Sequence, residues 1–189
     1  MSFNYLCKIL ILLFILFLCC NIHSNYISYS ETMQSKKTEI KLTSSAFKDG
    51  EMIPAKYTCD GNNFSPSLLW SSVPNGTKSI ALICDDPDAP MGTWVHWVIY
   101  DLPVSIKELP ENIPSQEKLQ NGAKHGINDF HKFGYGGPCP PGDTHRYYFK
   151  IYALDNETGI KPGATKEQLL KVMKGHILAE GQLMGKYTR

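Results

Sequence analysis

The sequence has almost no net charge and no long run of charge of either sign. It contains 19 lysine and arginine residues against 18 aspartate and glutamate residues, for a formal net charge of +1. Nucleic-acid binding depends on a surplus of basic side chains, so we expect no nucleic-acid partner. The chain also lacks His-Glu-x-x-His, Cys-x-x-Cys and Gly-x-Ser-x-Gly motifs. We therefore expect a protein that is not an enzyme and that holds neither a metal nor a cofactor.

Long apolar runs are also absent, apart from one at the N-terminus. Residues 9–18 are continuously apolar and are followed by a pair of cysteines. This run is shorter than the roughly 20 apolar residues that a membrane span needs, and it suits the core of a secretory signal. It lacks a small-residue cleavage site, so a lipidated cysteine and an uncleaved membrane anchor remain alternatives. We expect residues 1–22 to direct export (periplasmic, secreted or lipid-anchored), followed by a linker over 23–38 and one domain over 39–189.

Cysteine is scarce outside this N-terminal segment. Of the six cysteines, only Cys59, Cys84 and Cys139 lie beyond it. Cys84 belongs to an apolar run and is expected to be a buried thiol. Cys59 and Cys139 lie in turn-rich stretches, which makes them the better candidates for a disulfide in an exported protein. The sequence alone does not establish that they pair.

Short apolar runs alternate with turn residues along the rest of the chain. These runs predict strands over 39–43, 67–70, 79–84, 94–100 and 145–154. Proline and glycine predict a long loop over 109–128. Thr165 begins a capping-box spacing, and an apolar stripe from Leu169 to Leu178 predicts a C-terminal helix, weakened or kinked at Gly175. Many short strands with one helix predict a mainly β fold, either a sandwich or a barrel.

An acidic turn stiffened by proline leads into the strand richest in tryptophan. Asp-Asp-Pro-Asp-Ala-Pro occupies 85–90, and Trp-Val-His-Trp occupies 94–97. The prolines restrict the backbone, which leaves the carboxylates little freedom. Period-two alternation places His96 on one face with Val98 and Tyr100. The simpler alternative is a structural histidine bonded to one of the aspartates, and this is compatible with a role in binding.

A second stiff turn also delivers a histidine into a strand. Residues 134–142 include four glycines and three prolines, and His145, Arg146 and Tyr147 follow. Such a corner can bring backbone N–H groups close to an anion. Alternation directs His145 and Tyr147 to one side and Arg146 to the other, where we expect an ion pair. If the two turns meet, their histidines form one small polar pocket.

With both turns identified, the chain resembles the phosphatidylethanolamine-binding protein family, in the bacterial and archaeal branch called Raf-kinase-inhibitor-like. The matching motifs lie at 85–90, 92–97, 136–141 and 145–147, with support from 57–61 and 175–179. The resemblance implies an antiparallel β-sandwich with C-terminal helical elements. It also implies a pocket for phosphate-like anions, lined here by Asp86, Pro90, His96, Gly137, Pro138 and His145, with Asp88 and Tyr147 as adjacent candidates.

The function expected from this resemblance is non-enzymatic binding of a phosphate-like group or a phospholipid headgroup, with regulation of a partner protein as an extension. Two other functions stay open. One is inhibition of a protease or kinase through protein contact, and the other is hydrolysis by the pocket of histidines and aspartates. A homodimer is also compatible with the sequence.

Overall fold

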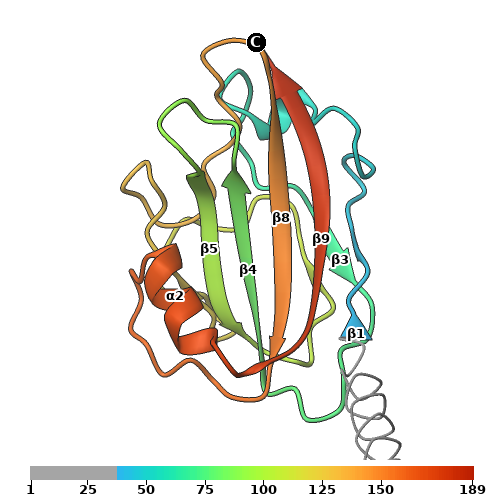
Figure 1. The fold of residues 1–189 in the computed structure, drawn as a ribbon, viewed down its shortest axis with the longest axis vertical. Coiled ribbons are helices and arrows are strands. Elements are labelled where there is room, and N and C mark those ends of the chain that lie inside the picture. Colours follow the sequence, from blue (N-terminus) through green and yellow to red (C-terminus); the bar gives the residue numbers. More distant parts are fainter. Residues whose placement is uncertain (1–37) are drawn as a thin grey trace, which may run out of the picture. The chain divides into compact units, whose positions relative to one another are not determined.

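A six-stranded sheet forms the centre of residues 38–189, the part of the chain that this computed structural model describes. In spatial order its strands are β1 (Thr38–Glu39), β9 (Ile177–Thr188), β8 (Thr144–Leu154), β4 (Ser79–Asp86), β5 (Trp94–Leu102) and β7 (Lys124–His125). Within this sheet the neighbours are antiparallel, except for the parallel pair β1 and β9. The long strands β5, β4, β8 and β9 lie side by side in Figure 1.

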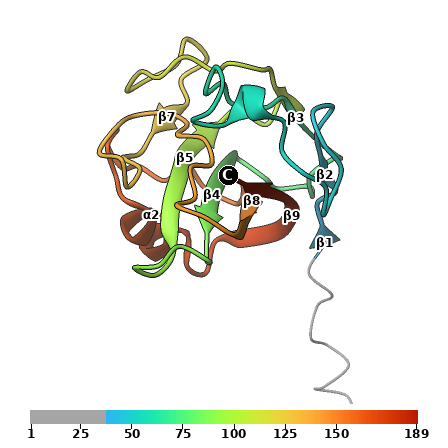
Figure 2. The same cartoon turned by 90° about the horizontal axis from the view of Figure 1, so that it is seen from above.

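A smaller sheet and a helix cover the two faces of the large sheet. The smaller sheet contains β2 (Leu42–Thr43), β3 (Leu68–Trp70) and β6 (Glu108–Leu109) in the order β2-β3-β6. Its buried side chains join those of the large sheet in one core. On the other face, α2 (Lys166–Met173) packs Leu169 and Met173 against side chains of β4 and β5. Figure 2 shows the helix and the smaller sheet on opposite sides, which confirms the predicted mainly β sandwich.

The central strand β4 explains why the sequence contains a continuous apolar run at this point. All eight of its residues are buried, because the helix covers one face and the smaller sheet the other. A strand buried on both faces needs no polar alternation. Asp85 and Asp86 extend this strand beyond its predicted end, so two carboxylates are carried into the interior.

Two sequence-based predictions need correction, one for the first strand and one for the C-terminal helix. The predicted strand at 39–43 is two short strands, β1 and β2, that belong to different sheets. The helix is shorter than predicted: it begins with the expected capping box at Thr165 but ends at Met173. Gly175 has φ of 86°, a left-handed conformation that ends the helix and does not kink it. Residues 177–188 form the long strand β9, which the sequence analysis missed.

The remaining expectations have mixed outcomes. Cys59 pairs with Cys139, with their Cα atoms 5.4 Å apart, and Cys84 is a buried free thiol as predicted. The predicted loop over 109–128 contains the short strand β7. The N-terminal segments expected over 1–22 and 23–38 lie outside the described residues, except for Thr38 in β1. Within the described part, no helix combines the length and the hydrophobicity that crossing a membrane requires.

Candidate functional site

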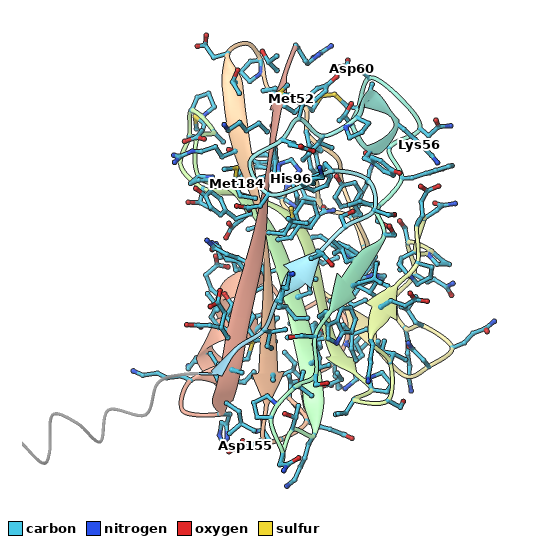
Figure 3. The ribbon with its side chains drawn as sticks, turned by 90° about the vertical axis from the view of Figure 1, so that its right-hand side faces the viewer. Met52, Lys56, Asp60, His96, Asp155 and Met184 are labelled. Carbon is cyan, nitrogen blue, oxygen red and sulfur yellow. A yellow bond between two sulfur atoms is a disulfide. The ribbon has the colours of Figure 1, made fainter. Side chains whose placement is uncertain are left out.

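The two stiff turns meet at one end of the large sheet. Because β4 is antiparallel to both β5 and β8, its last residue lies beside the first residues of both neighbours. Asp86 pairs with Trp94, and Asp85 pairs with Tyr148. This is the end of the sheet where the C-terminus lies in Figure 1. In Figure 3, His96 lies toward the end that carries Asp60, away from Asp155 at the opposite end.

A cavity of about 220 Å³ lies between the turns, and we call it the anion cavity after the expectation drawn from the sequence. Five predicted site residues line it: Asp86, Pro90, His96, His145 and Tyr147. The other lining residues are Ala89, Met91, Trp94, Phe130, Cys139, Pro140 and Pro141. The predicted residues Asp88, Gly137 and Pro138 lie outside its lining. The structure therefore brings together both imidazoles and one carboxylate, within walls that are mostly apolar.

His96 reaches the cavity from a β-bulge. Cys84 pairs with Trp97 and Asp85 pairs with Val95, so β4 offers no partner to His96. One extra residue in a strand breaks period-two alternation and re-aims the side chain at that position. The bulge therefore sets the direction of the imidazole.

The bulge overturns the prediction that His96 shares a face with Val98 and Tyr100. Those two side chains pack under α2, whereas the His96 ring packs edge-to-face on Tyr147, with ring centroids 5.1 Å apart. A second edge-to-face contact joins His96 to Phe130, at 5.3 Å. Aromatic rings on two sides thus fix the imidazole plane.

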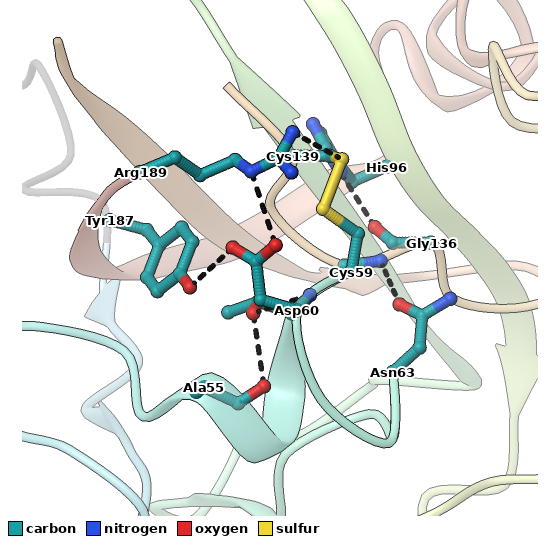
Figure 4. The surroundings of a disulfide bond; sticks show 11 residues. Ala55, Cys59, Asp60, Asn63, His96, Gly136, Cys139, Tyr187 and Arg189 are labelled. Carbon is teal, nitrogen blue, oxygen red and sulfur yellow. Dashed lines mark hydrogen bonds and ion pairs between the residues drawn. A yellow bond between two sulfur atoms is a disulfide. The ribbon is translucent and has the colours of Figure 1, made fainter. Parts of the chain in front are cut away.

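The hydrogen bond of His96 fixes which of its nitrogens carries a proton. Its Nδ1 lies 2.6 Å from the backbone carbonyl oxygen of Gly136 (Figure 4). A carbonyl oxygen only accepts, so Nδ1 donates and Nε2 of the neutral ring is an acceptor. Burial lowers the pKa of His96 below its usual value, although the Gly136 carbonyl acts in the opposite direction. The alternative of a bond to an aspartate is therefore wrong for His96.

The pairing of histidine with aspartate occurs at His145 instead. Nδ1 of His145 lies 2.7 Å from Oδ2 of Asp86, and both side chains are buried. The other carboxylate oxygen of Asp86 accepts the backbone N–H of Asp88 at 2.8 Å. Asp86 therefore orients the second imidazole and stiffens its own turn.

Tyr147 brings a hydroxyl group without a partner to this cavity. The residue is 0% exposed, and within residues 38–189 its hydroxyl has no hydrogen bond of acceptable geometry. Burial, and then the nearby charge of Asp86, raise the pKa of Tyr147 far above its usual value, so the phenol stays neutral. The Asp86 carboxylate is also close enough to act as an acceptor for this hydroxyl, which adds to the rise in its pKa. The hydroxyl therefore lacks a well-aligned hydrogen bond, although a possible acceptor lies beside it.

Asp88 has a structural partner outside the cavity. The guanidinium of Arg146 donates to both of its carboxylate oxygens, at 2.7 and 2.8 Å. These bonds lower the pKa of Asp88 below its usual value. The predicted ion-pair role of Arg146 is confirmed, and the pair ties the acidic turn to the start of β8.

The turn that contains Gly137 and Pro138 is fastened to a distant segment of the chain. The Gly137 N–H donates to Oδ1 of Asn63 at 2.7 Å, and the Cys59 N–H donates to the Pro138 carbonyl at 3.0 Å. The Cys59–Cys139 disulfide closes the same contact covalently (Figure 4).

Two glycines of this turn, Gly136 and Gly137, use their N–H groups within the protein. A Cβ at Gly137 would lie 2.5 Å from the carbonyl oxygen of Tyr57, so glycine is needed for close packing. The N–H of Gly136 donates to the His96 carbonyl at 2.9 Å, and that of Gly137 is used by Asn63. The N–H groups of Gly136 and Gly137 are therefore used within the protein and are not free to bind an anion.

Two residues of the cavity wall, Met91 and Phe130, lie outside all the motifs that the sequence analysis identified. Phe130 lies two residues beyond the predicted long loop, where no motif marked it, and its ring contacts both Trp94 and His96. Met91 stands at the rim and is 94% exposed. Within residues 38–189, no group of three or more histidine, cysteine, aspartate or glutamate side chains is placed to hold a metal.

Comparison with known proteins gives consistent matches over the described residues. The family model for phosphatidylethanolamine-binding protein matches residues 43–188. The UPF0098 protein of Methanothermobacter thermautotrophicus is 50% identical over 150 residues, covering 79% of this chain and 99% of that protein. The UPF0098 protein of Aquifex aeolicus is 50% identical over 153 residues, covering 79% of this chain and 89% of that protein.

Two crystal structures share the fold. A homologue of phosphatidylethanolamine-binding protein from Chlamydia trachomatis is 44% identical, with a TM-score of 0.73, and covers 80% of this chain and 98% of its own. Escherichia coli YbcL, described as a new member of the mammalian family of these proteins, is 34% identical with a TM-score of 0.74. That match covers 80% of this chain and 99% of YbcL.

Proposed function

Because the chain belongs to the phosphatidylethanolamine-binding protein family, we propose that it is a non-enzymatic binding protein for phosphate-like groups, either free or in a phospholipid headgroup. One observation carries the proposal. The imidazoles of His96 and His145 and the unpaired hydroxyl of Tyr147 line one small cavity, built from two turns that are distant in sequence. Such a group of donors suits an oxyanion.

Each group has a distinct part in binding. The Tyr147 hydroxyl donates to a ligand oxygen, which removes the penalty of its burial. His145 keeps its Nδ1 bond to Asp86 and, when protonated, directs a second N–H toward the ligand. Nε2 of neutral His96 can only accept, so one proton must lie between it and a phosphate oxygen. That proton comes either from the imidazolium or from a monoprotonated phosphate.

The apolar walls strengthen these hydrogen bonds. Phe130, Pro140 and Pro141 surround the donors and keep water away from them. Electrostatic interactions are stronger in such a medium than in water. The volume of about 220 Å³ is below the range of roughly 300–1,000 Å³ for drug-sized ligands, so we expect only the anionic head of a ligand to enter.

Calorimetric titration at about pH 6 with inorganic phosphate and with phosphoethanolamine tests this function. We expect the double variant His96→Ala, His145→Ala to lose binding. We expect Tyr147→Phe to bind about tenfold more weakly, which corresponds to one lost hydrogen bond to the ligand. Tyr148→Phe is the matched control, because that ring lies in the same strand but outside the cavity lining. Equal binding by the wild type and the double variant would refute the proposal.

We also propose that the protein is exported. The solvent-exposed disulfide between Cys59 and Cys139 supports this location, because such bonds persist in oxidising compartments and are rare in reducing ones. Fractionation of the native cells, with alkylation of free thiols before lysis, tests the proposal. We expect the mature chain outside the cytoplasm with Cys59 and Cys139 protected from alkylation. Recovery in the cytoplasm with both thiols modified would contradict it.

A further inference from the structure

A larger groove of about 740 Å³ adjoins the anion cavity. The two spaces share Phe130 and Cys139 in their linings. Between them runs the backbone of Gly136 and Gly137, which lines the groove and bonds to His96 of the cavity through the Gly136 carbonyl. Figure 4 shows this backbone with His96 and Asn63 beside it. The two spaces therefore share a wall and part of their rims.

The lining of the groove combines aromatic rings with polar groups that have no protein partner. Its rings are the partly buried Phe64, Phe130 and Phe133. Its polar side chains include Asn62, Asn112, Ser115 and Lys132. These four residues are solvent-exposed, and within residues 38–189 their side chains make no hydrogen bond or ion pair with another protein group. Asn128 is different, because its amide is buried and fully used in bonds to the surrounding loop.

We propose that this groove binds the sugar of a phosphorylated carbohydrate whose phosphate occupies the anion cavity. The inference rests on the proposed function, because it extends the same ligand. A sugar ring presents apolar C–H faces to aromatic rings and hydroxyl groups to amides. The groove offers both, and its volume is within the usual range for small ligands.

An acyl chain fits the groove less well. It would cover the amides of Asn62 and Asn112 and the ammonium of Lys132 without offering them hydrogen bonds. Burying polar groups without partners is unfavourable. The chemistry of the lining therefore favours a hydroxyl-bearing extension over a lipid tail.

Calorimetry on the full-length protein tests the inference, with inorganic phosphate, glucose 1-phosphate, glucose and micelles of a short-chain phosphatidic acid as probes. We expect glucose 1-phosphate to bind about tenfold or more tightly than inorganic phosphate, from one or two added hydrogen bonds. The double variant Asn62→Ala, Asn112→Gly should lose that advantage and keep its affinity for inorganic phosphate. Glycine is chosen at position 112 because Asn112 has φ of 60°. Asn75→Ala, in an exposed turn outside both linings, is the matched control.

The outcomes separate this inference from the proposed function. If the wild type binds no phosphate compound, the proposed function fails. If inorganic phosphate and glucose 1-phosphate bind equally, the anion cavity stands and the groove inference fails. Tighter binding of the phosphatidic acid than of glucose 1-phosphate, or of free glucose as tightly as its phosphate, would also overturn the inference.

Discussion

Removing the disulfide by the double substitution Cys59→Ser, Cys139→Ser should lower the free energy of unfolding substantially. The bond joins residues separated by 80 positions in the sequence. For a loop of that length, the loss of chain entropy in the unfolded state corresponds to about 4.5 kcal/mol at 25 °C. Small domains have only about 5–15 kcal/mol of stability in total. The variant should therefore lose a large part of its resistance to denaturant.

The folded structure itself should change little. Three hydrogen bonds join the same two segments: Cys59 N–H to the Pro138 carbonyl at 3.0 Å, Gly137 N–H to Asn63 at 2.7 Å, and the Tyr135 hydroxyl to the Tyr57 carbonyl at 2.9 Å. They hold the wall of the anion cavity in place when the covalent bond is gone. We therefore expect the phosphate affinity of the folded variant to change by less than about tenfold.

Urea unfolding followed by tryptophan fluorescence measures the loss. The oxidised wild type, the wild type with reductant and the double variant are compared by midpoint and by slope. The slope should be larger without the bond, because the unfolded chain then exposes more surface. Reductant should shift the wild type toward the variant and leave the variant unchanged. If wild type and variant differ by less than about 1 kcal/mol, the bond does not constrain the unfolded chain and the reasoning is wrong.

Three further predictions concern the buried histidines and Gly137. Burial lowers the pKa of His96 and of His125 in the folded chain. Below about pH 6.5 these histidines are therefore protonated in the unfolded chain before they are protonated in the folded chain. Stability should fall as the pH drops below that value, and identical urea midpoints at about pH 7.5 and pH 5.5 would contradict this. The affinity for phosphate should also rise as the pH falls over this range. Measuring the affinity for sulfate, which carries no proton in this range, distinguishes the two sources of the shared proton. If the sulfate affinity rises in parallel, the proton is on an imidazole, and if it does not rise, the proton is on the phosphate. Gly137→Ala should lower both stability and phosphate affinity because its Cβ would meet the Tyr57 carbonyl at 2.5 Å. Gly142→Ala, where a Cβ meets nothing within 4 Å, is the control for that substitution, and an equal effect of both would reject the packing argument.

The sequence predicted five of the residues that line the anion cavity. The two stiff turns indicated His96 and His145, and the family resemblance added Asp86, Pro90 and Tyr147. The direction of His96 was not predictable, because the bulge depends on how β5 pairs with β4. Phe130 was missed for a similar reason, since its role comes from contacts across the fold.

The long strand β9 was not predicted because its sequence contains two glycines, which are unfavourable in strands. A Cβ at Gly181 would lie 1.7 Å from the Ile40 carbonyl oxygen, and one at Gly185 would lie 2.5 Å from the side chain of Ile53. Close packing therefore requires residues that weaken the strand signal. The predicted helix extended to residues 177–178 because Ile177 and Leu178 fit the hydrophobic period of a helix as well as that of a strand. The left-handed conformation of Gly175 is what divides the helix from the strand in the structure.

A single peptide group joins the cavity to the groove. The carbonyl oxygen of Gly136 and the N–H of Gly137 belong to the same amide, which accepts from the His96 ring at 2.6 Å and donates to Asn63 at 2.7 Å. Hydrogen bonds in such a chain polarise one another. We therefore expect a molecule that hydrogen-bonds to the Asn63 side chain to change the strength of the bond between this peptide group and the His96 ring.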